Sequence, residues 1–144
     1  MADYQRDKLE RFTSEIYESL NKLKELSRLD FPQFTDDVHK VASAKYFLIV
    51  AIESAIDLSN HIISKNRFRQ PEGYADTFRV LEEEGILEEK FADELEKMAR
   101  FRNRLVHIYW EVDDEVIYDI LNENIEDLDR FVQDITKFLN EDED

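Results

Sequence analysis

Apolar residues recur with a helical period along nearly the whole chain. A first helix is marked by apolar positions from Leu9 to Leu26, and it closes near Pro32 because the residue before a proline resists the α conformation. A second helix, with Thr35 as its predicted N-cap, continues as far as Ile63. Its apolar stripe is the longest in the sequence and predicts the centre of the core.

Three further helices follow. A short one starts near Tyr74 and ends where Gly85 can take the left-handed position that often follows a helix. A fourth covers 91–105, and a fifth opens at Asp113 or Asp114 and continues close to the C-terminus. Only two glycines and two prolines are present, which is little material for the turns of an all-β fold. The pattern predicts an all-α, four-to-five-helix up-and-down bundle.

Length and composition limit the organisation further. We expect one domain over 1–140, followed by an acidic tail at 141–144. The absence of cysteine excludes disulfides and thiolate metal sites. The longest apolar run, Tyr46 to Ile52, is too short to span a bilayer, and the N-terminus has no apolar targeting segment. The sequence predicts a cytoplasmic protein with no membrane contact.

A formal net charge of −16 argues against DNA binding by the chain as a whole. Two windows without acidic residues stand out against that charge, at 58–71 and 97–110. The basic residues proposed for phosphate contact lie in these windows: Lys65, Arg67, Arg69 and Arg104. If the windows lie close in space they could hold an RNA backbone. Otherwise these are the solvated cations that any acidic protein carries.

Residues 102–109 combine an arginine, a histidine and a tyrosine, at Arg102, His107 and Tyr109. Arg102 could hold a phosphate and stabilise a phosphorane, and His107 could carry a proton. These groups suffice for metal-independent RNA cleavage, with the 2′-hydroxyl as internal nucleophile. The alternative is structural: an arginine paired with an acid, and a histidine closing a helix.

Helix geometry restricts how these groups can cooperate. On an ideal helix Arg102 and His107 point about 140° apart, whereas Arg102 and Tyr109 nearly eclipse. The first two therefore converge only if the helix ends between them or a second subunit supplies the partner. One histidine cannot easily act as both acid and base in one step, which favours a homodimer with two facing motifs.

A polar stripe formed by Glu53, Asp57 and His61 interrupts the apolar second helix at four-residue spacing. It could orient Arg102 or His107, or simply be a solvated face. It also resembles half of a carboxylate metal site. A full site would need a Glu-x-x-His pair, which the chain lacks, so we predict no metal.

Arg102-x4-His107-x-Tyr109 is similar to the Arg-x4-His-x-Tyr signature of HepT-like toxins, small helical ribonucleases of the HEPN superfamily. The resemblance spans the chain from the second helix onward. Further segments that follow the family's order are Ala55-Ile56-Asp57-Leu58-Ser59-Asn60-His61-Ile62-Ile63, Pro71-Glu72-Gly73-Tyr74, Leu81-Glu82-Glu83-Glu84-Gly85-Ile86-Leu87 and Arg102-Asn103-Arg104-Leu105-Val106-His107. The first thirty residues match no signature.

The resemblance implies a homodimeric toxin of a type VII toxin-antitoxin system, an endoribonuclease. Arg102 and His107 would be its catalytic pair, with Asn103 and Asp57 in supporting roles. Tyr109 would receive AMP from an MntA-like nucleotidyltransferase antitoxin, whose reaction uses ATP and Mg, so that no cofactor is expected on this chain. RNA is the implied substrate, with transfer RNA among the targets of family members.

A different class of function is compatible with the same residues. The chain could be a non-catalytic module that binds or presents substrate to a nucleotidyltransferase, with its acidic surface as a protein interface. RNA cleavage separates the two readings.

Overall fold

The computed structural model describes residues 2–143, and within that range it is entirely helical. Seven α-helices and one 3-10 turn follow one another. Their bounds are α1 Arg6–Ser27, α2 Phe31–Thr35, α3 Val38–Asn66, α4 Tyr74–Glu83, α5 Glu89–His107, η1 Tyr109–Glu111, α6 Asp114–Glu123 and α7 Glu126–Glu143. The predicted all-α class is confirmed. α7 continues through most of the predicted acidic tail, whereas Asp144 lies outside the described residues.

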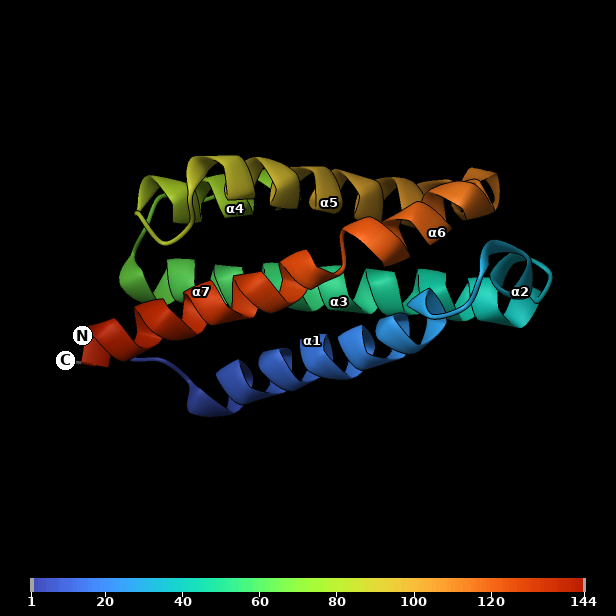
Figure 1. Ribbon diagram of the computed structural model, residues 1–144. Helices are drawn as coiled ribbons and strands as arrows, with labels where there is room; N and C mark the ends of the chain where they lie inside the picture. The colour runs from blue at the N-terminus through green and yellow to red at the C-terminus, as the bar shows by residue number, and fades with distance from the viewer. Residues whose placement is uncertain (1, 144) are drawn as a thin grey trace.

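α3 is the central helix, as its apolar stripe predicted. α1 runs back along it in the opposite direction, and α4 and α5 pack side by side as a hairpin on the other flank (Figure 1). α6 and α7 complete the bundle against α1 and α3. Thirteen residues of α3 are buried, more than in any other helix for which burial is described, which explains why its apolar run is the longest.

The short helix α2 differs from the prediction. Asp30 caps it by accepting a hydrogen bond from the Gln33 amide at 2.8 Å, and the Gln33 side chain accepts in return from the Asp30 amide. Pro32 therefore sits inside the first turn of a helix, where its missing N–H is harmless, and does not merely end the preceding one. The prediction that Thr35 caps α3 was wrong. The cap is Asp37, whose carboxylate accepts from the His39 amide at 2.9 Å.

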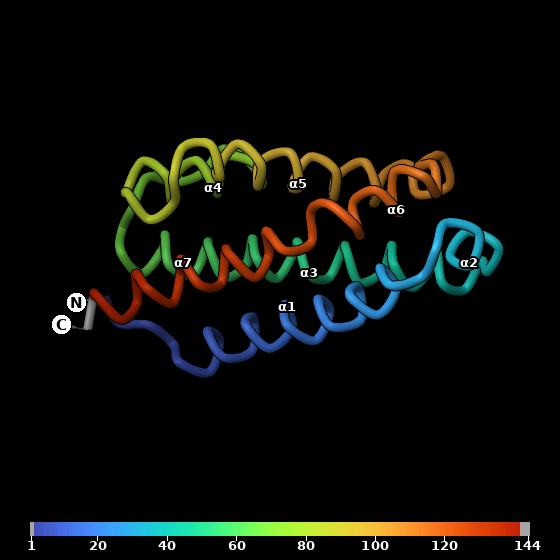
Figure 2. Tube along the Cα trace, in the orientation of Figure 1, coloured from blue at the N-terminus to red at the C-terminus, as the bar shows by residue number. Residues whose placement is uncertain are grey.

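The last predicted helix is broken into two. α6 begins after Asp113, as expected, but the chain leaves the helix at Asn124 and resumes as α7 (Figure 2). Nothing in the apolar spacing marks this break, because Leu121, Ile125 and Leu128 keep a helical step across it and all are buried. Asparagine favours local backbone hydrogen bonds over helix, which is the one local signal at this point.

Packing of the C-terminal helix into the core is expected to contribute strongly to the stability. Phe131 is fully buried, and its ring meets that of Phe78 edge to face, with centroids 5.7 Å apart. Replacing Phe131 with Ala should lower the free energy of unfolding by roughly 3 to 5 kcal/mol, because contacts are lost and a cavity remains. Urea unfolding measures this. Val38→Ala, at a residue that is 71% exposed, should change it by less than about 0.5 kcal/mol. Equal effects of the two changes would contradict the packing described.

Candidate active site

The motif lies at the C-terminal end of α5 and in the turn that follows. Phe101 and Leu105 hold this end of the helix in the core. The helix stops at His107 because Ile108 leaves the helical conformation, with φ −129° and ψ 42°. Arg104 and His107 occupy the last turn, where the helix dipole favours positive charge, and both are exposed.

Arg102 is held in place by three hydrogen bonds. Its Nε and Nη2 both donate to Oε1 of Glu53, at 3.0 and 2.5 Å, and its Nη1 donates to Oδ1 of Asn103 at 3.0 Å. The guanidinium also lies 4.9 Å from the ring centroid of Tyr74. The side chain is only 14% exposed. An arginine fixed this way presents its remaining N–H groups in a defined direction.

His107 does not meet Arg102 within one protomer. α5 is continuous through both residues, so their side chains diverge by about 140° as on an ideal helix. In the part of the chain that the structure describes, no hydrogen bond or ion pair joins them. The condition that the helix ends between the two residues is not met. Within the described protomer the two side chains therefore do not converge.

Tyr109 lies beside α3. It begins the 3-10 turn, so the expected eclipse of Arg102 and Tyr109 on one helix face was wrong. Nζ of Lys45 donates to the Tyr109 carbonyl oxygen at 2.9 Å and lies 4.4 Å from the centroid of the tyrosine ring. Trp110 meets the same ring edge to face and is 90% exposed. Lys45 was not identified from the sequence, because a lysine within an apolar run gives no signal of its role.

Of the polar stripe on α3, Glu53 is the residue that reaches the motif. Asp57 lies one turn farther along and is exposed, and desolvation together with the negative charges of Glu53 and Glu15 raises its pKa. The orienting role predicted for Asp57 has no direct contact behind it in the described structure. His61 Nε2 instead accepts from the Gln5 amide at 3.1 Å. Residues 2–143 contain no group of three or more potential metal ligands.

Lys65, in the first basic window, lies far from the Tyr109 end of the second window in a protomer. Tyr109 packs on Lys45, and Lys65 follows about 20 residues later on the same helix, which corresponds to roughly 30 Å. Arg69 is bound by Asp76 and Glu83, which raise its pKa, while Arg69 in turn lowers the pKa of Asp76 to about 2. Its charge is therefore already neutralised.

The other predicted phosphate contacts differ in setting. Lys65 lies in the last turn of α3, Arg67 caps that helix in the left-handed conformation with φ 58°, and Arg104 is exposed in the motif segment. Their contact with RNA stays a prediction, and only Arg104 shares a helix end with His107.

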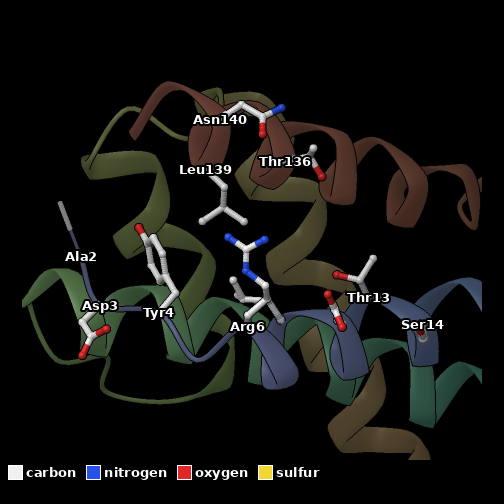
Figure 3. A pocket seen from close by; sticks show the side chains of 11 residues that line it. Ala2, Asp3, Tyr4, Arg6, Thr13, Ser14, Thr136, Leu139 and Asn140 are labelled. Atoms are coloured by element: carbon white, nitrogen blue, oxygen red, sulfur yellow. The ribbon is translucent and has the colours of Figure 1, made fainter. Parts of the chain in front are cut away.

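A separate hollow of about 500 Å³ opens where the N-terminal segment meets the start of α1 and the end of α7 (Figure 3). Tyr4, Arg6, Leu139 and Asn140 are among the residues that line it. None of the motif residues does so. A second hollow of about 370 Å³ does reach the motif, through Asn103 and Tyr74.

The part of the chain that the structure describes contains no helix long and apolar enough to cross a membrane.

Comparison with known proteins adds to this geometry. The family model described as "Ribonuclease HepT-like" matches residues 16–135. A relative from Shewanella oneidensis, named mRNA nuclease HepT, is 28% identical over 103 residues, covering 72% of this chain and 77% of the relative. A relative from Archaeoglobus fulgidus, named putative RNase, is 30% identical over 130 residues, covering 90% and 94%.

A solved structure shares the fold. It is a tri-AMPylated Shewanella oneidensis HEPN toxin in complex with MNT antitoxin, with a TM-score of 0.84 at 24% sequence identity. The similarity covers 91% of this chain and 98% of that one. At this identity the match concerns the helical architecture alone.

Proposed function

The chain belongs to the ribonuclease HepT-like family, and we propose that it is the endoribonuclease toxin of a toxin-antitoxin pair. Its active form is a homodimer that cleaves RNA without a metal ion. A partner nucleotidyltransferase of the MNT class silences it by transferring AMP to Tyr109. The single observation that carries the proposal is the fixed Arg102 guanidinium on the helix whose end presents His107.

Arg102 is equipped to bind the scissile phosphate. A guanidinium has five N–H donors, and the bonds to Glu53 and Asn103 use three of them. One N–H on each terminal nitrogen is left, which suits a phosphate with two acceptor oxygens. Glu53 therefore orients the arginine without blocking it. Asn103 fixes the opposite side, which fits its predicted supporting role.

The reaction needs proton transfer and charge stabilisation only. The 2′-oxygen attacks the adjacent phosphorus, the bond to the 5′-oxygen breaks, and a 2′,3′-cyclic phosphate forms. His107 takes the 2′-hydroxyl proton or returns one to the leaving oxygen, and Arg102 stabilises the added charge on the phosphorane. Two copies of His107 across a dimer would divide the roles of base and acid.

Exposed apolar side chains support a dimer at this place. Val106, Ile108 and Trp110 are 41%, 38% and 90% exposed at the end of α5, and Tyr46 is 60% exposed on the adjoining part of α3. The contact of Lys45 with Tyr109 places these two segments side by side. A cluster of apolar surface at a site that is incomplete in one protomer favours pairing of two copies there.

AMP transfer to Tyr109 would block the proposed RNA site. The phenol oxygen forms a bond to the α-phosphorus of ATP, the α–β phosphoanhydride breaks, and pyrophosphate leaves while a base on the partner takes the phenol proton. The added phosphodiester is a bulky anion beside the position of the RNA phosphate, so occupancy and charge both oppose binding. ATP and Mg belong to the partner's site, and this chain needs no cofactor.

Intact mass after incubation with Mg-ATP and a partner nucleotidyltransferase of the MNT class tests the proposal. The wild-type chain should gain AMP and lose RNA cleavage. Tyr109→Phe should gain none and keep cleaving, because the ring and its contact with Lys45 are preserved while the nucleophile is lost. Tyr46→Phe is the control at a second tyrosine, which is 60% exposed, and should behave as wild type.

Failure would be recognisable. If the purified wild-type chain, free of AMP, cleaves no RNA, the enzymatic part of the proposal is wrong and a substrate-presenting module takes its place. If AMP accumulates equally on Tyr109→Phe, the modified residue has been misassigned.

A further inference from the structure

Lys45 is the only charged side chain that is buried in the described part of the protein. It is 7% exposed, on the inner side of α3. Burial of an ammonium group is costly unless an acid compensates its charge. Residues 2–143 offer none, because no carboxylate lies within ion-pair distance of its Nζ.

Both contacts of this ammonium are with Tyr109. Nζ donates to the tyrosine carbonyl oxygen at 2.9 Å and lies 4.4 Å from the centroid of its ring. A carbonyl and an aromatic face are neutral partners that orient a cation and leave its charge uncompensated. One hydrogen bond also leaves two of the three N–H donors of the ammonium without an acceptor among the described residues.

We propose that Lys45 is the counter-charge of the AMP acceptor site: it positions Tyr109 through the carbonyl and the ring, and binds the phosphate that becomes attached to the phenol. This inference rests on the proposed modification of Tyr109. Because Nζ lies 4.4 Å from the ring centroid and the phenol oxygen is bonded to that ring, we place a phosphoryl oxygen attached to the phenol within reach of the unused N–H donors. The Lys45 ammonium, which has no acidic partner before the reaction, then forms an ion pair with the attached phosphate.

The same contact acts during the transfer. Negative charge grows on the α-phosphate as the phenol oxygen bonds to it and pyrophosphate departs, and a nearby fixed cation stabilises that charge more in the transition state than in free ATP. Lys45 takes no proton in this step. The contribution of Lys45 to AMP transfer is electrostatic and depends on its positive charge. Its hydrogen bond to the Tyr109 carbonyl needs only an N–H donor.

Two substitutions separate these contributions. Lys45→Gln keeps a donor for the carbonyl and removes the charge, while Lys45→Arg keeps the charge. Lys40→Gln, on the same helix with a partly exposed side chain, is the matched control. The rate of AMP addition to each full-length chain is followed by intact mass at several ATP concentrations. The melting temperature and the emission of Trp110, the single tryptophan, which touches the Tyr109 ring, report on the fold and the turn.

We expect Lys45→Gln to lower the maximal rate of AMP addition by roughly tenfold or more, with Lys45→Arg within about threefold of wild type. Modification should raise the melting temperature of the wild-type chain and not that of Lys45→Gln, since only the former gains an ion pair. An unchanged rate in Lys45→Gln overturns the inference. Equal losses in the Gln and Arg variants, with altered Trp110 emission, also overturn it and assign Lys45 to structure alone. If wild type accepts no AMP, the proposed function itself fails, which the wild-type sample alone reveals.

Discussion

Replacing His107 with Ala is expected to reduce RNA cleavage by roughly 10²- to 10⁴-fold while leaving the fold unchanged. The imidazole is exposed at the end of α5 and makes no hydrogen bond or ion pair with the described residues, so its removal costs no packing and leaves no partner unpaired. The loss would therefore be chemical. Single-turnover cleavage of a labelled RNA, with the melting temperature measured on the same sample, gives both quantities.

His39→Ala is the matched control. His39 is likewise an exposed histidine near the start of α3, and its backbone amide, not its imidazole, donates to the Asp37 carboxylate there. It should keep full activity. Wild-type cleavage by His107→Ala would exclude His107 as the proton carrier and turn attention to Tyr109, the other titratable group of the motif.

The helical class and the main helices could be predicted from the sequence because the apolar period is regular and burial follows it. Gly85 shows the same agreement at a single residue: it takes φ 77° after α4, as its position suggested. The differences arose where local hydrogen bonding overrides the period. α2 depends on the reciprocal hydrogen bonds between Asp30 and Gln33. The break after α6 is invisible in the apolar pattern, because Leu121 and Ile125 are both buried and keep a helical spacing across it.

The site was less predictable than the fold. The motif residues are local in sequence and could be found by their spacing, but the groups that orient them come from α3, at Glu53 and Lys45. Glu53 carried a weak signal as a polar residue in an apolar helix. Such a signal cannot decide whether Glu53 or Asp57, one turn apart, meets the arginine. That depends on how α5 is placed against α3, which only the packed structure defines.

The structure also shows which basic side chains are neutralised by acids and which are not. A chain of net charge −16 would repel RNA over its whole surface. Arg69 adds nothing against this repulsion, because Asp76 and Glu83 neutralise it. Arg104 and His107 lie together at the end of α5, where the negative end of the helix dipole favours positive charge. Pairing of two such ends in a homodimer would double the local positive charge, so the dimer that the chemistry needs would also supply the electrostatics.

Arg102→Lys is expected to lower cleavage by roughly 10²- to 10³-fold although the positive charge is kept. The native guanidinium bonds Glu53 and Asn103 at once and still has two N–H donors for phosphate. A lysine ammonium has three donors on one atom and cannot hold both neighbours and a phosphate in a fixed plane. The effect should fall on the rate of the chemical step more than on RNA affinity, since the charge that attracts RNA remains.

Arg100→Lys tests whether this effect is specific. Arg100 lies two residues earlier on the same helix, is exposed, and pairs with Glu96 at 3.2 Å on the surface. Such a pair contributes at most about 1 kcal/mol, and a lysine can replace it. Measured side by side, Arg100→Lys should cleave as wild type does. If both substitutions weaken RNA binding equally and leave the single-turnover rate intact, Arg102 is one more surface cation, and its clamp on Glu53 has a purely structural purpose.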